Sequence, residues 1–521
     1  MKPFEAPLDD ILFSLDHVAG AGALADWDGA LAGEILGHFA AFAEGVIAPL
    51  DEPGDAQGCR LEDGTVKMPD GFAAAYAELA EGGWQGLTAP ETFGGMAQNQ
   101  LVAAAVSEIF SGANHAMQMV CNLVPGAVAT LLRFGTEAQQ QTWIPRLAAG
   151  EALSTMCLTE PGAGSDLTRV RCKAEKVGNG WAITGEKIFI SGGDQDMSDD
   201  ILHLVLARTG TREEGIKGLS LFLTGKKAAG RTISITRIEE KLGLHASPTC
   251  QMAFDGTPAQ LVGEEGAGLA AMFTVMNHAR IDVALQGVAH ASRAHDIARS
   301  YADERVQGRR PDGSEAVLSD HADVRRMLDE QRALTLGARG MAHLTLVALE
   351  RGDNPALVDF LTPLCKVFCS EAGIRAADLG IQILGGYGYL PEYRVSQTWR
   401  DARITSIYEG ANGIHELATT TRGLKLHGGA GADAFLAMIG NLTDDADVLS
   451  ICSQWRETRE TVLAARDPAA LAHDFTQLTC ELFLRAVWAR IADSEDPEMI
   501  RLREFVMRRP LPVNFPFSGN G

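Results

Sequence analysis

Residues 156–166 read MCLTEPGAGSD, a short apolar run that enters a loop of very small residues. The run is typical of the end of a β-strand, and the loop carries hydroxyl groups at Thr159 and Ser165. Small residues let backbone N–H groups come close to a bound molecule. The segment therefore predicts either a contact with a flat polar ligand or, with about equal weight, a tight turn between domains.

This segment also marks a change in secondary structure along the chain. The residues before it are rich in Ala and Leu and are broken by Gly and Pro, which predicts helices. From 156 to about 265, short alternating runs such as 219–223 predict strands, with 181–184 and 188–191 as a hairpin around Gly185. No helical pattern separates these strands, so they predict an antiparallel barrel or sandwich. Helical patterns return near Gly268 and continue to about residue 508.

Composition bounds the class of protein. The 521 residues are 46% hydrophobic, which is enough for a large core and excludes a mostly disordered chain. The 68 Asp and Glu outnumber the 45 Lys and Arg, for a formal net charge of -23. Such a surface repels phosphate backbones and anionic lipids, so it argues against nucleic-acid and membrane partners.

The cysteines and one apolar stretch bear on the compartment. Nine scattered Cys without a metal-binding spacing predict reduced thiols in a cytoplasmic protein and no metal site. The stretch 109–132 is long enough to span a bilayer, but it contains seven strongly polar or helix-breaking positions, including His115 and Pro125. We expect a buried helix pair there.

The nucleotide-binding fingerprint fails because Leu167 stands where it needs Gly, and neither a P-loop nor a GxSxG elbow is present.

Three further segments carry residues of chemical interest. Residues 185–193 (GEKIFISGG) place Phe189 where an aromatic side chain could flank a ring system. Residues 276–280 (MNHAR) open a long helix, and Arg280 in this apolar stretch needs an anionic partner. Residues 382–389 (QILGGYGY) are followed by 400–410 (RDARITSIYEG), which contain Glu409. Burial in a dry cleft would raise the pKa of Glu409 and suit it to act as a general base, although a lone Glu is more often a surface residue.

Together, and in this order, the four segments resemble the acyl-CoA dehydrogenase family over about residues 30–425. Residues 7–11 (PLDDI) and 245–250 (HASPTC) resemble a long-chained branch that includes the 3-methylmercaptopropionyl-CoA dehydrogenases. The resemblance implies an α+β, mostly α fold. Its parts are an N-terminal helical domain (1–155), a middle antiparallel β-barrel (156–267), a C-terminal four-helix bundle (268–426) and a short helical C-terminal extension (427–521).

The resemblance also implies an activity. It is the FAD-dependent α,β-dehydrogenation of a short- or medium-chain acyl-CoA, possibly a thioether one, to the trans-2-enoyl-CoA, as in β-oxidation, with electrons passed to an electron-transfer flavoprotein. A carboxylate takes the α-proton and the β-hydrogen leaves as hydride to the flavin. Glu409 is the implied base, since Ala279 occupies the position from which some relatives supply it. The family's FAD site is often shared between subunits, which implies a homodimer or homotetramer.

Residue by residue, the resemblance implies two sets of binding residues, of which Ser165 belongs to both. Arg305, Gln382 and Gly386 match the residues that meet the FAD pyrophosphate from a neighbouring subunit, while Ala411 replaces a usual threonine. The implied cofactor-binding residues are Met156, Leu158, Thr159, Gly164, Ser165, Phe189, Ser191, Arg305, Gln382 and Gly386. The implied substrate-binding residues are Ser165, Asn277, Arg280, Tyr408 and Gly410.

Other functions on the same fold stay open at this point. A flavin-dependent acyl-CoA oxidase or lyase would differ in where the electrons go. A DNA-associated flavoprotein needs a basic groove, which the net charge of -23 disfavours. A catalytically silent scaffold is disfavoured because Glu409, Arg280 and the small-residue loop are all present.

Overall fold

The computed structural model describes residues 2–509, and for Asn277 and His278 it describes the backbone alone. The chain divides into two compact units. The first comprises the described parts of Met1–Ala40, Ala104–Gly112 and Arg280–Gly521, and the second comprises Ala41–Ala103 and Ala113–Ala279. The domain boundaries expected at 155/156, 267/268 and 426/427 stay predictions, and residues 510–521 of the expected extension lie outside the described residues.

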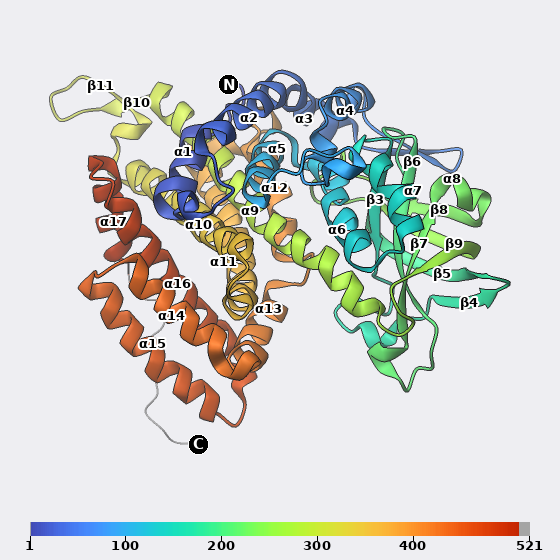
Figure 1. Ribbon diagram of the computed structural model, residues 1–521. Helices are drawn as coiled ribbons and strands as arrows, with labels where there is room; N and C mark the ends of the chain where they lie inside the picture. The colour runs from blue at the N-terminus through green and yellow to red at the C-terminus, as the bar shows by residue number, and fades with distance from the viewer. Residues whose placement is uncertain (1, 510–521) are drawn as a thin grey trace. The chain divides into compact units, whose positions relative to one another are not determined.

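The first unit is built almost entirely from helices (Figure 1). A two-stranded hairpin, β10 (Val306–Arg309) with β11 (Glu315–Val317), follows α9. The helices are α1 (Leu8–Phe13), most of α9 (Gly268–Glu304), α10 (Ala322–Arg351), α11 (Pro355–Leu384), α12 (Val395–Ala402), α13 (Asn412–Ala418), α14 (Ala430–Leu442), α15 (Ala446–Ala464), α16 (Ala472–Ala492) and α17 (Pro497–Met507).

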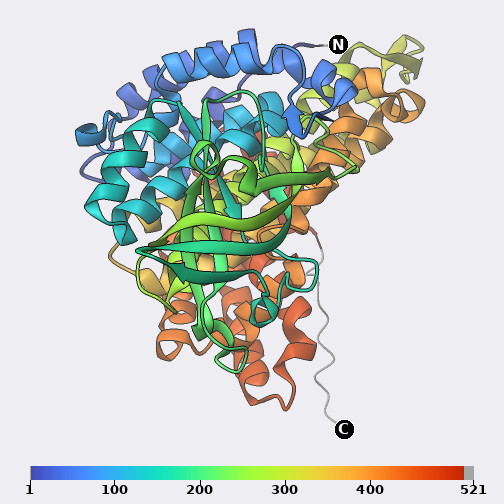
Figure 2. The same cartoon turned by 90° about the vertical axis from the view of Figure 1, so that its right-hand side faces the viewer.

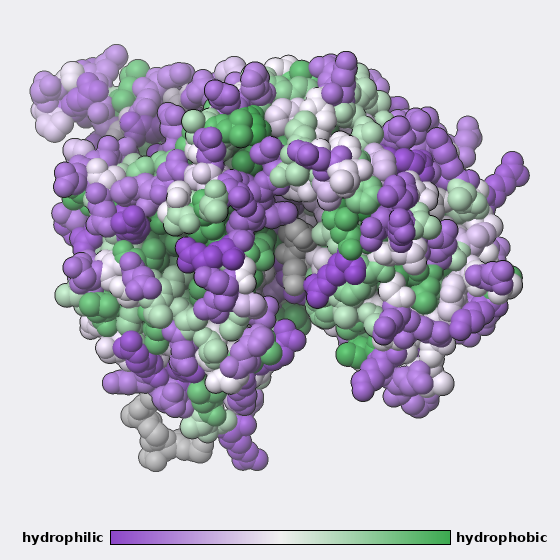
Figure 3. Space-filling view, viewed as in Figure 1, coloured by the Kyte–Doolittle hydropathy of each residue, from purple (hydrophilic) through white to green (hydrophobic). Residues whose placement is uncertain are grey.

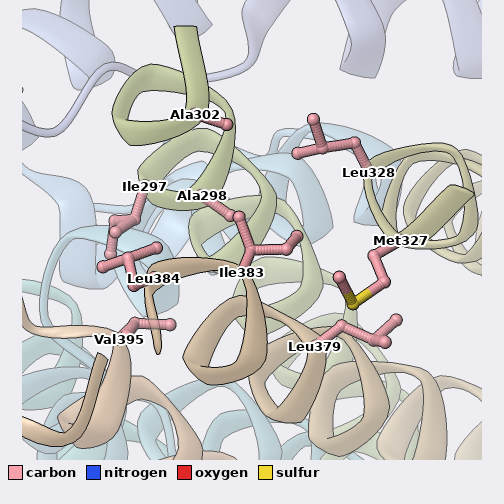
Figure 4. Close-up of a cluster of buried hydrophobic side chains, with 9 residues drawn as sticks. All are labelled: Ile297, Ala298, Ala302, Met327, Leu328, Leu379, Ile383, Leu384 and Val395. Carbon is pink, nitrogen blue, oxygen red and sulfur yellow. The ribbon is translucent and has the colours of Figure 1, made fainter. Parts of the chain in front are cut away.

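A cluster of nine buried apolar side chains joins four of these helices (Figure 4). Ile297, Ala298 and Ala302 repeat at helical spacing, which gives α9 one apolar face. That face meets side chains of α10, α11 and α12. The cluster therefore holds the C-terminal ends of α9 and α11 together. Its members are Ile297, Ala298, Ala302, Met327, Leu328, Leu379, Ile383, Leu384 and Val395.

The helices after residue 430 pack against α11 through aromatic side chains. Phe360 of α11 lies 5.5 Å from Phe435 of α14, measured between ring centroids, and Phe435 lies 5.7 Å from Trp455 of α15. Trp488 of α16 donates a hydrogen bond to the Ala333 carbonyl of α10 at 3.0 Å. Close packing of aromatic rings is a large source of burial energy. The extension is therefore an integral part of the first unit.

Most helices of the second unit precede its seven-stranded sheet, and the short α8 (Lys226–Ala229) lies between β7 and β8. The preceding helices are part of α2 (Gly29–Phe42), α3 (Asp51–Gln57), α4 (Phe72–Glu81), parts of α5 (Gln100–Cys121), α6 (Val124–Phe134) and α7 (Glu137–Ala148), with the hairpin β1 (Arg60–Glu62)–β2 (Thr65–Lys67). The buried helix pair expected at 109–132 is confirmed as α5 and α6. By length and composition, the helical stretch Gly29–Gln57 could cross a membrane, and α5 with α6 could form a second, bent span.

Seven strands of the second unit form the expected barrel (Figure 2). Strands β6, β4, β5, β9 and β7 pair in turn, and β7 pairs back to β6, which closes the ring. Most pairs are antiparallel, but β3 with β6 and β4 with β6 are parallel. The strands are β3 (Ala152–Cys157), β4 (Lys173–Val177), β5 (Gly180–Ser191), β6 (Asp200–Arg208), β7 (Leu219–Gly225), β8 (Ile233–Ile238) and β9 (Thr249–Val262).

The hairpin predicted around Gly185 is wrong. Strand β5 runs through this position, and the hairpin is β4–β5, which turns after Val177. Gly185 has φ +148° at an irregularity in the pairing with β9, and a β-carbon there would lie 2.7 Å from Cys172 Cα. Glycine inside a strand often marks such a close approach.

The face drawn in Figure 3 is mostly hydrophilic, with apolar residues scattered among polar ones. This agrees with a chain in which 22% of the residues are charged. Single exposed apolar residues are ordinary on protein surfaces.

Candidate active site

The residues singled out in the sequence fall into two sets, one in each compact unit. In the second unit, strand β3 ends at Cys157 and the small-residue loop follows. Met156, Leu158 and Thr159 are partly buried, whereas Gly164 and Ser165 are exposed. The backbone N–H of Ile188 donates to the Thr159 carbonyl at 2.9 Å. The loop and strand β5 therefore form one surface.

A buried ion pair between Lys187 and Glu160 holds the start of the small-residue loop in place. The Lys187 side chain is fully buried, and its Nζ donates to the Leu158 carbonyl at 2.9 Å and to Glu160 Oε1 at 2.8 Å. The Glu160 carboxylate also accepts backbone N–H groups of Arg171 at 2.7 Å and Cys172 at 3.0 Å. A buried charge is tolerated when it is paired and hydrogen-bonded in this way. This pair was not predicted from the sequence.

Phe189 presents an exposed ring from a strained position. Its φ is +59°, which is rare for an aromatic residue, and the strand pairing is irregular between Lys187 and Ile190. The side chain is 61% exposed, and Ser191 follows at the end of β5. Backbone strain of this kind often occurs at functional sites. The ring is placed to stack on a flat ligand.

In the first unit, Arg305 and the turn after α11 lie together. The Arg305 guanidinium carbon is 5.6 Å from the centroid of the Tyr387 ring. Gln382 is in the last turn of α11, and the N–H of Gly385 bonds to its carbonyl. Gly386 is exposed, with no atom within 4 Å of where a β-carbon would lie. An exposed guanidinium beside an open turn suits a phosphate group.

Glu409 lies on a left-handed turn that precedes α13. Its φ is +53°, and the φ of Gly410 is +96°. A β-carbon at Gly410 would lie 2.7 Å from His415 Nε2, so only glycine fits. The carbonyls of this turn are held by two side chains: His415 Nε2 lies 3.0 Å from the Glu409 oxygen, and Lys366 Nζ donates to the Gly410 oxygen at 2.8 Å.

Burial sets the protonation of Glu409. Desolvation is the largest effect and raises the pKa of Glu409 to about 7. The cations Arg280 and Lys366 lower this pKa, and the carboxylate of Asp282 raises it further. The expectation that burial would raise this pKa is confirmed. Burial lowers the pKa of Arg280, and the nearby Glu409 carboxylate opposes this effect. Glu409 is therefore the anionic neighbour that we expected for Arg280 from the sequence. A carboxylate with a pKa near 7 is poised to accept a proton.

The Tyr408 hydroxyl begins a series of linked hydrogen bonds. Its hydroxyl donates to Gln286 Oε1, Gln286 Nε2 donates to Asp282 Oδ2 at 2.8 Å, and the Ser107 hydroxyl donates to the same carboxylate. Burial raises the pKa of Tyr408 well above its usual range, so the hydroxyl stays a donor. This series fixes the residue next to Glu409. The Asn277 side chain lies outside the described residues.

Comparisons with known proteins show which families and folds this chain resembles. Models of the acyl-CoA dehydrogenase N-terminal, middle and C-terminal domains match residues 34–151, 155–257 and 266–424. The chain is 42% identical to a 3-methylmercaptopropionyl-CoA dehydrogenase of Ruegeria pomeroyi over 465 residues, which cover 84% of this chain and 79% of the relative. It is 34% identical to the broad-specificity linear acyl-CoA dehydrogenase FadE5 of Mycobacterium tuberculosis, over 80% of this chain and 74% of the relative.

Among solved structures, Caenorhabditis elegans ACDH-11 in complex with C11-CoA has a similar fold. The TM-score is 0.84 at 20% identity, and the match covers 98% of this chain and 92% of that one. The match extends over the helices after residue 430 as well as the three family domains.

Proposed function

Because the chain belongs to the acyl-CoA dehydrogenase family, an oxidoreductase family whose members bind FAD, we propose which reaction it performs. It converts a short- or medium-chain acyl-CoA to the trans-2-enoyl-CoA and passes the electrons to an electron-transfer flavoprotein. The observation that carries this proposal is Glu409, a carboxylate with a pKa of about 7 on a turn anchored by Lys366 and His415.

The residues present fit FAD. The second unit offers an exposed aromatic ring at Phe189, the hydroxyl groups of Thr159 and Ser165, and open space beside Gly164. The first unit offers the exposed guanidinium of Arg305 for a phosphate. FAD supplies a hydride acceptor, which no side chain can replace. We propose that the cofactor-binding residues are those that the family resemblance implies.

The chain's own residues handle the proton. A thioester acidifies its α-hydrogen only modestly, so removal needs a positioned base and a polarised carbonyl. We assign the base to the Glu409 carboxylate and the polarising donor to the Glu409 backbone N–H. Arg280 stabilises the carboxylate before it takes the proton. Ala279 has no group that could replace it.

The relatives support a substrate class. The Ruegeria pomeroyi relative, which is 42% identical to this chain, acts by its name on 3-methylmercaptopropionyl-CoA. The acyl group of that molecule is a three-carbon chain that carries a thioether sulfur. We propose a short thioether acyl-CoA as the preferred substrate and straight short and medium chains as further substrates. Turnover with an artificial electron acceptor should give a product two hydrogens lighter than the substrate by mass spectrometry.

The electron acceptor separates a dehydrogenase from an oxidase. A dehydrogenase reduced by acyl-CoA should re-oxidise slowly in air and quickly with an electron-transfer flavoprotein. Rapid re-oxidation in air with release of peroxide would instead identify an oxidase. Stopped-flow mixing of the reduced protein with each acceptor measures both rates.

The rate of acyl-CoA-driven flavin reduction should depend on pH. Glu409 accepts a proton only as the carboxylate, and burial raises its pKa to about 7. We therefore expect kcat/KM to rise with pH through about 7 and to fall about tenfold per pH unit below it. A rate that stays flat down to about pH 5, near where an ordinary exposed glutamate titrates, would contradict this assignment.

Two further proposals concern assembly and location. Arg305, Gln382 and Gly386 are all exposed in the single chain, which supports a shared FAD site in a homodimer or homotetramer. The nine cysteines are all free, which supports a cytoplasmic protein. Sedimentation of the FAD-loaded protein tests the first proposal, and fractionation of cells tests the second.

A further inference from the structure

We propose that Lys366 is a positioning residue for the base. Its ammonium group holds the Glu409–Gly410 turn in place and favours the carboxylate form of Glu409. This inference rests on the proposed function, in which Glu409 takes the α-proton. Lys366 belongs to the middle of α11, 44 residues before the carbonyl that it binds.

The contacts of Lys366 lie on both sides of Ala411. Its side chain is fully buried, and Nζ donates to the Gly410 carbonyl at 2.8 Å and to Asn412 Oδ1 at 2.8 Å. Both acceptors are neutral. The charge of the ammonium is therefore balanced by carboxylates at longer range, of which Glu409 has the larger effect and Glu371 the next.

Asn412 is oriented for this contact. Its Nδ2 donates to Ser370 Oγ at 3.1 Å and to Glu371 Oε1 at 3.1 Å, both on α11. With the amide nitrogen committed to these acceptors, the amide oxygen faces Lys366. Asn412 is 9% exposed and begins α13. Helix α11 thus holds the Gly410 carbonyl of the strained turn and the Asn412 side chain that follows it.

The turn needs such support. Glu409 is not glycine, yet it has a left-handed φ of +53°, a conformation that persists only when the surroundings hold it. Burial lowers the pKa of His415 to about 4, so the imidazole that faces the Glu409 carbonyl is neutral near pH 7. Lys366, in contrast, is a cation that binds this turn directly.

The charged groups that face Glu409 come from two helices. Helix α9 supplies Arg280, which favours the carboxylate, and Asp282, which disfavours it. Helix α11 supplies Lys366, which favours the carboxylate. Burial lowers the pKa of Lys366 to about 8, and the ammonium is thus still protonated where Glu409 titrates. Removing this cation should raise the pKa of Glu409.

The test is Lys366→Met in the full-length FAD-loaded protein. Methionine keeps much of the length and apolar stem of lysine but neither donates nor carries charge. We expect unchanged FAD content and unchanged reduction by dithionite. We expect the acid limb of the kcat/KM profile for a thioether acyl-CoA to move up by about one pH unit. The carboxylate fraction at pH 7 would then fall from about a half to about a tenth, so flavin reduction at pH 7 should fall by about fivefold.

Arg485→Met is the matched control, since Arg485 is also a buried cation of the first unit but pairs with Glu481 on α16. It should leave the acid limb at about pH 7. Asn412→Ala is the second variant, because it removes one of the two acceptors and leaves the cation. It should slow flavin reduction with a smaller shift of the acid limb.

The outcomes separate the two claims. If Lys366→Met and Asn412→Ala both keep the wild-type rate and acid limb while Glu409→Gln is inactive, the role of Lys366 is wrong and the proposed function stands. If Glu409→Gln stays active, the proposed base itself is wrong. If Lys366→Met does not fold, Asn412→Ala decides, and an unchanged rate overturns the inference.

Discussion

Glu409→Gln should bind FAD and acyl-CoA and yet fail to bleach the flavin. Glutamine has nearly the same size, so it can occupy the same turn, but its amide cannot accept the α-proton. Ala279 offers no second base. We expect the rate of anaerobic flavin reduction by acyl-CoA to fall by about 10⁴-fold, near the upper end of what a general base contributes. Stopped-flow absorbance of the flavin band measures this rate directly.

Glu416→Gln is a suitable control for this prediction. Glu416 is also a buried glutamate, seven residues further along on α13, but its partner is His473. We expect flavin reduction in Glu416→Gln to stay near the wild-type rate. If Glu409→Gln instead reduces its flavin within about tenfold of wild type, another residue must take the proton.

Arg339→Met should cause a large loss of stability. The Arg339 side chain is fully buried, and its Nε and Nη2 donate to Glu108 Oε1 at 2.9 and 2.8 Å. It also donates to Asp10 Oδ2 at 3.4 Å. Without the guanidinium, the Glu108 carboxylate is buried and unpaired. We expect the free energy of unfolding to fall by about 3–5 kcal/mol, measured by chemical denaturation.

The double variant Arg339→Met/Glu108→Leu tests the cause. Burial raises the pKa of Glu108, and Arg339 opposes this rise, so the single variant should leave a carboxyl group whose folded pKa lies above its unfolded pKa. The penalty should therefore be greatest at high pH and shrink as the pH falls through that folded pKa. Removing both groups should restore most of the lost stability. A double variant as unstable as the single one would show that the packing of Arg339, and not its charge, carries the effect.

The barrel and the helices around it were predictable from the sequence because hydrophobic periodicity changes at about residue 156. The hairpin predicted around Gly185 was wrong because glycine between two apolar runs usually marks a turn. Here the glycine instead allows close contact with Cys172. The parallel pairing of β3 with β6 could not be predicted, since periodicity carries no information on which distant strands pair.

Glu409 could be singled out from the sequence, whereas the residues that support its turn could not. Glu409 follows an apolar pair and precedes a glycine, a setting that local sequence shows directly. Lys366 is a single charge in an apolar run, whereas Lys187 directly follows Glu186, and their partners lie 44 and 27 residues away. The lone cation at 366 is a signal that could have been used, because a buried charge must find a partner. No such local signal marks Lys187.

Anaerobic titration of the FAD-loaded wild-type protein with a panel of acyl-CoAs tests the central claim most directly. The panel should contain a short thioether acyl-CoA, straight short and medium chains, and a branched chain. We predict that the short thioether and straight chains bleach the visible flavin band, with the thioether substrate fastest and free CoA without effect. A protein whose flavin is reduced by dithionite but by no acyl-CoA in the panel would contradict the account.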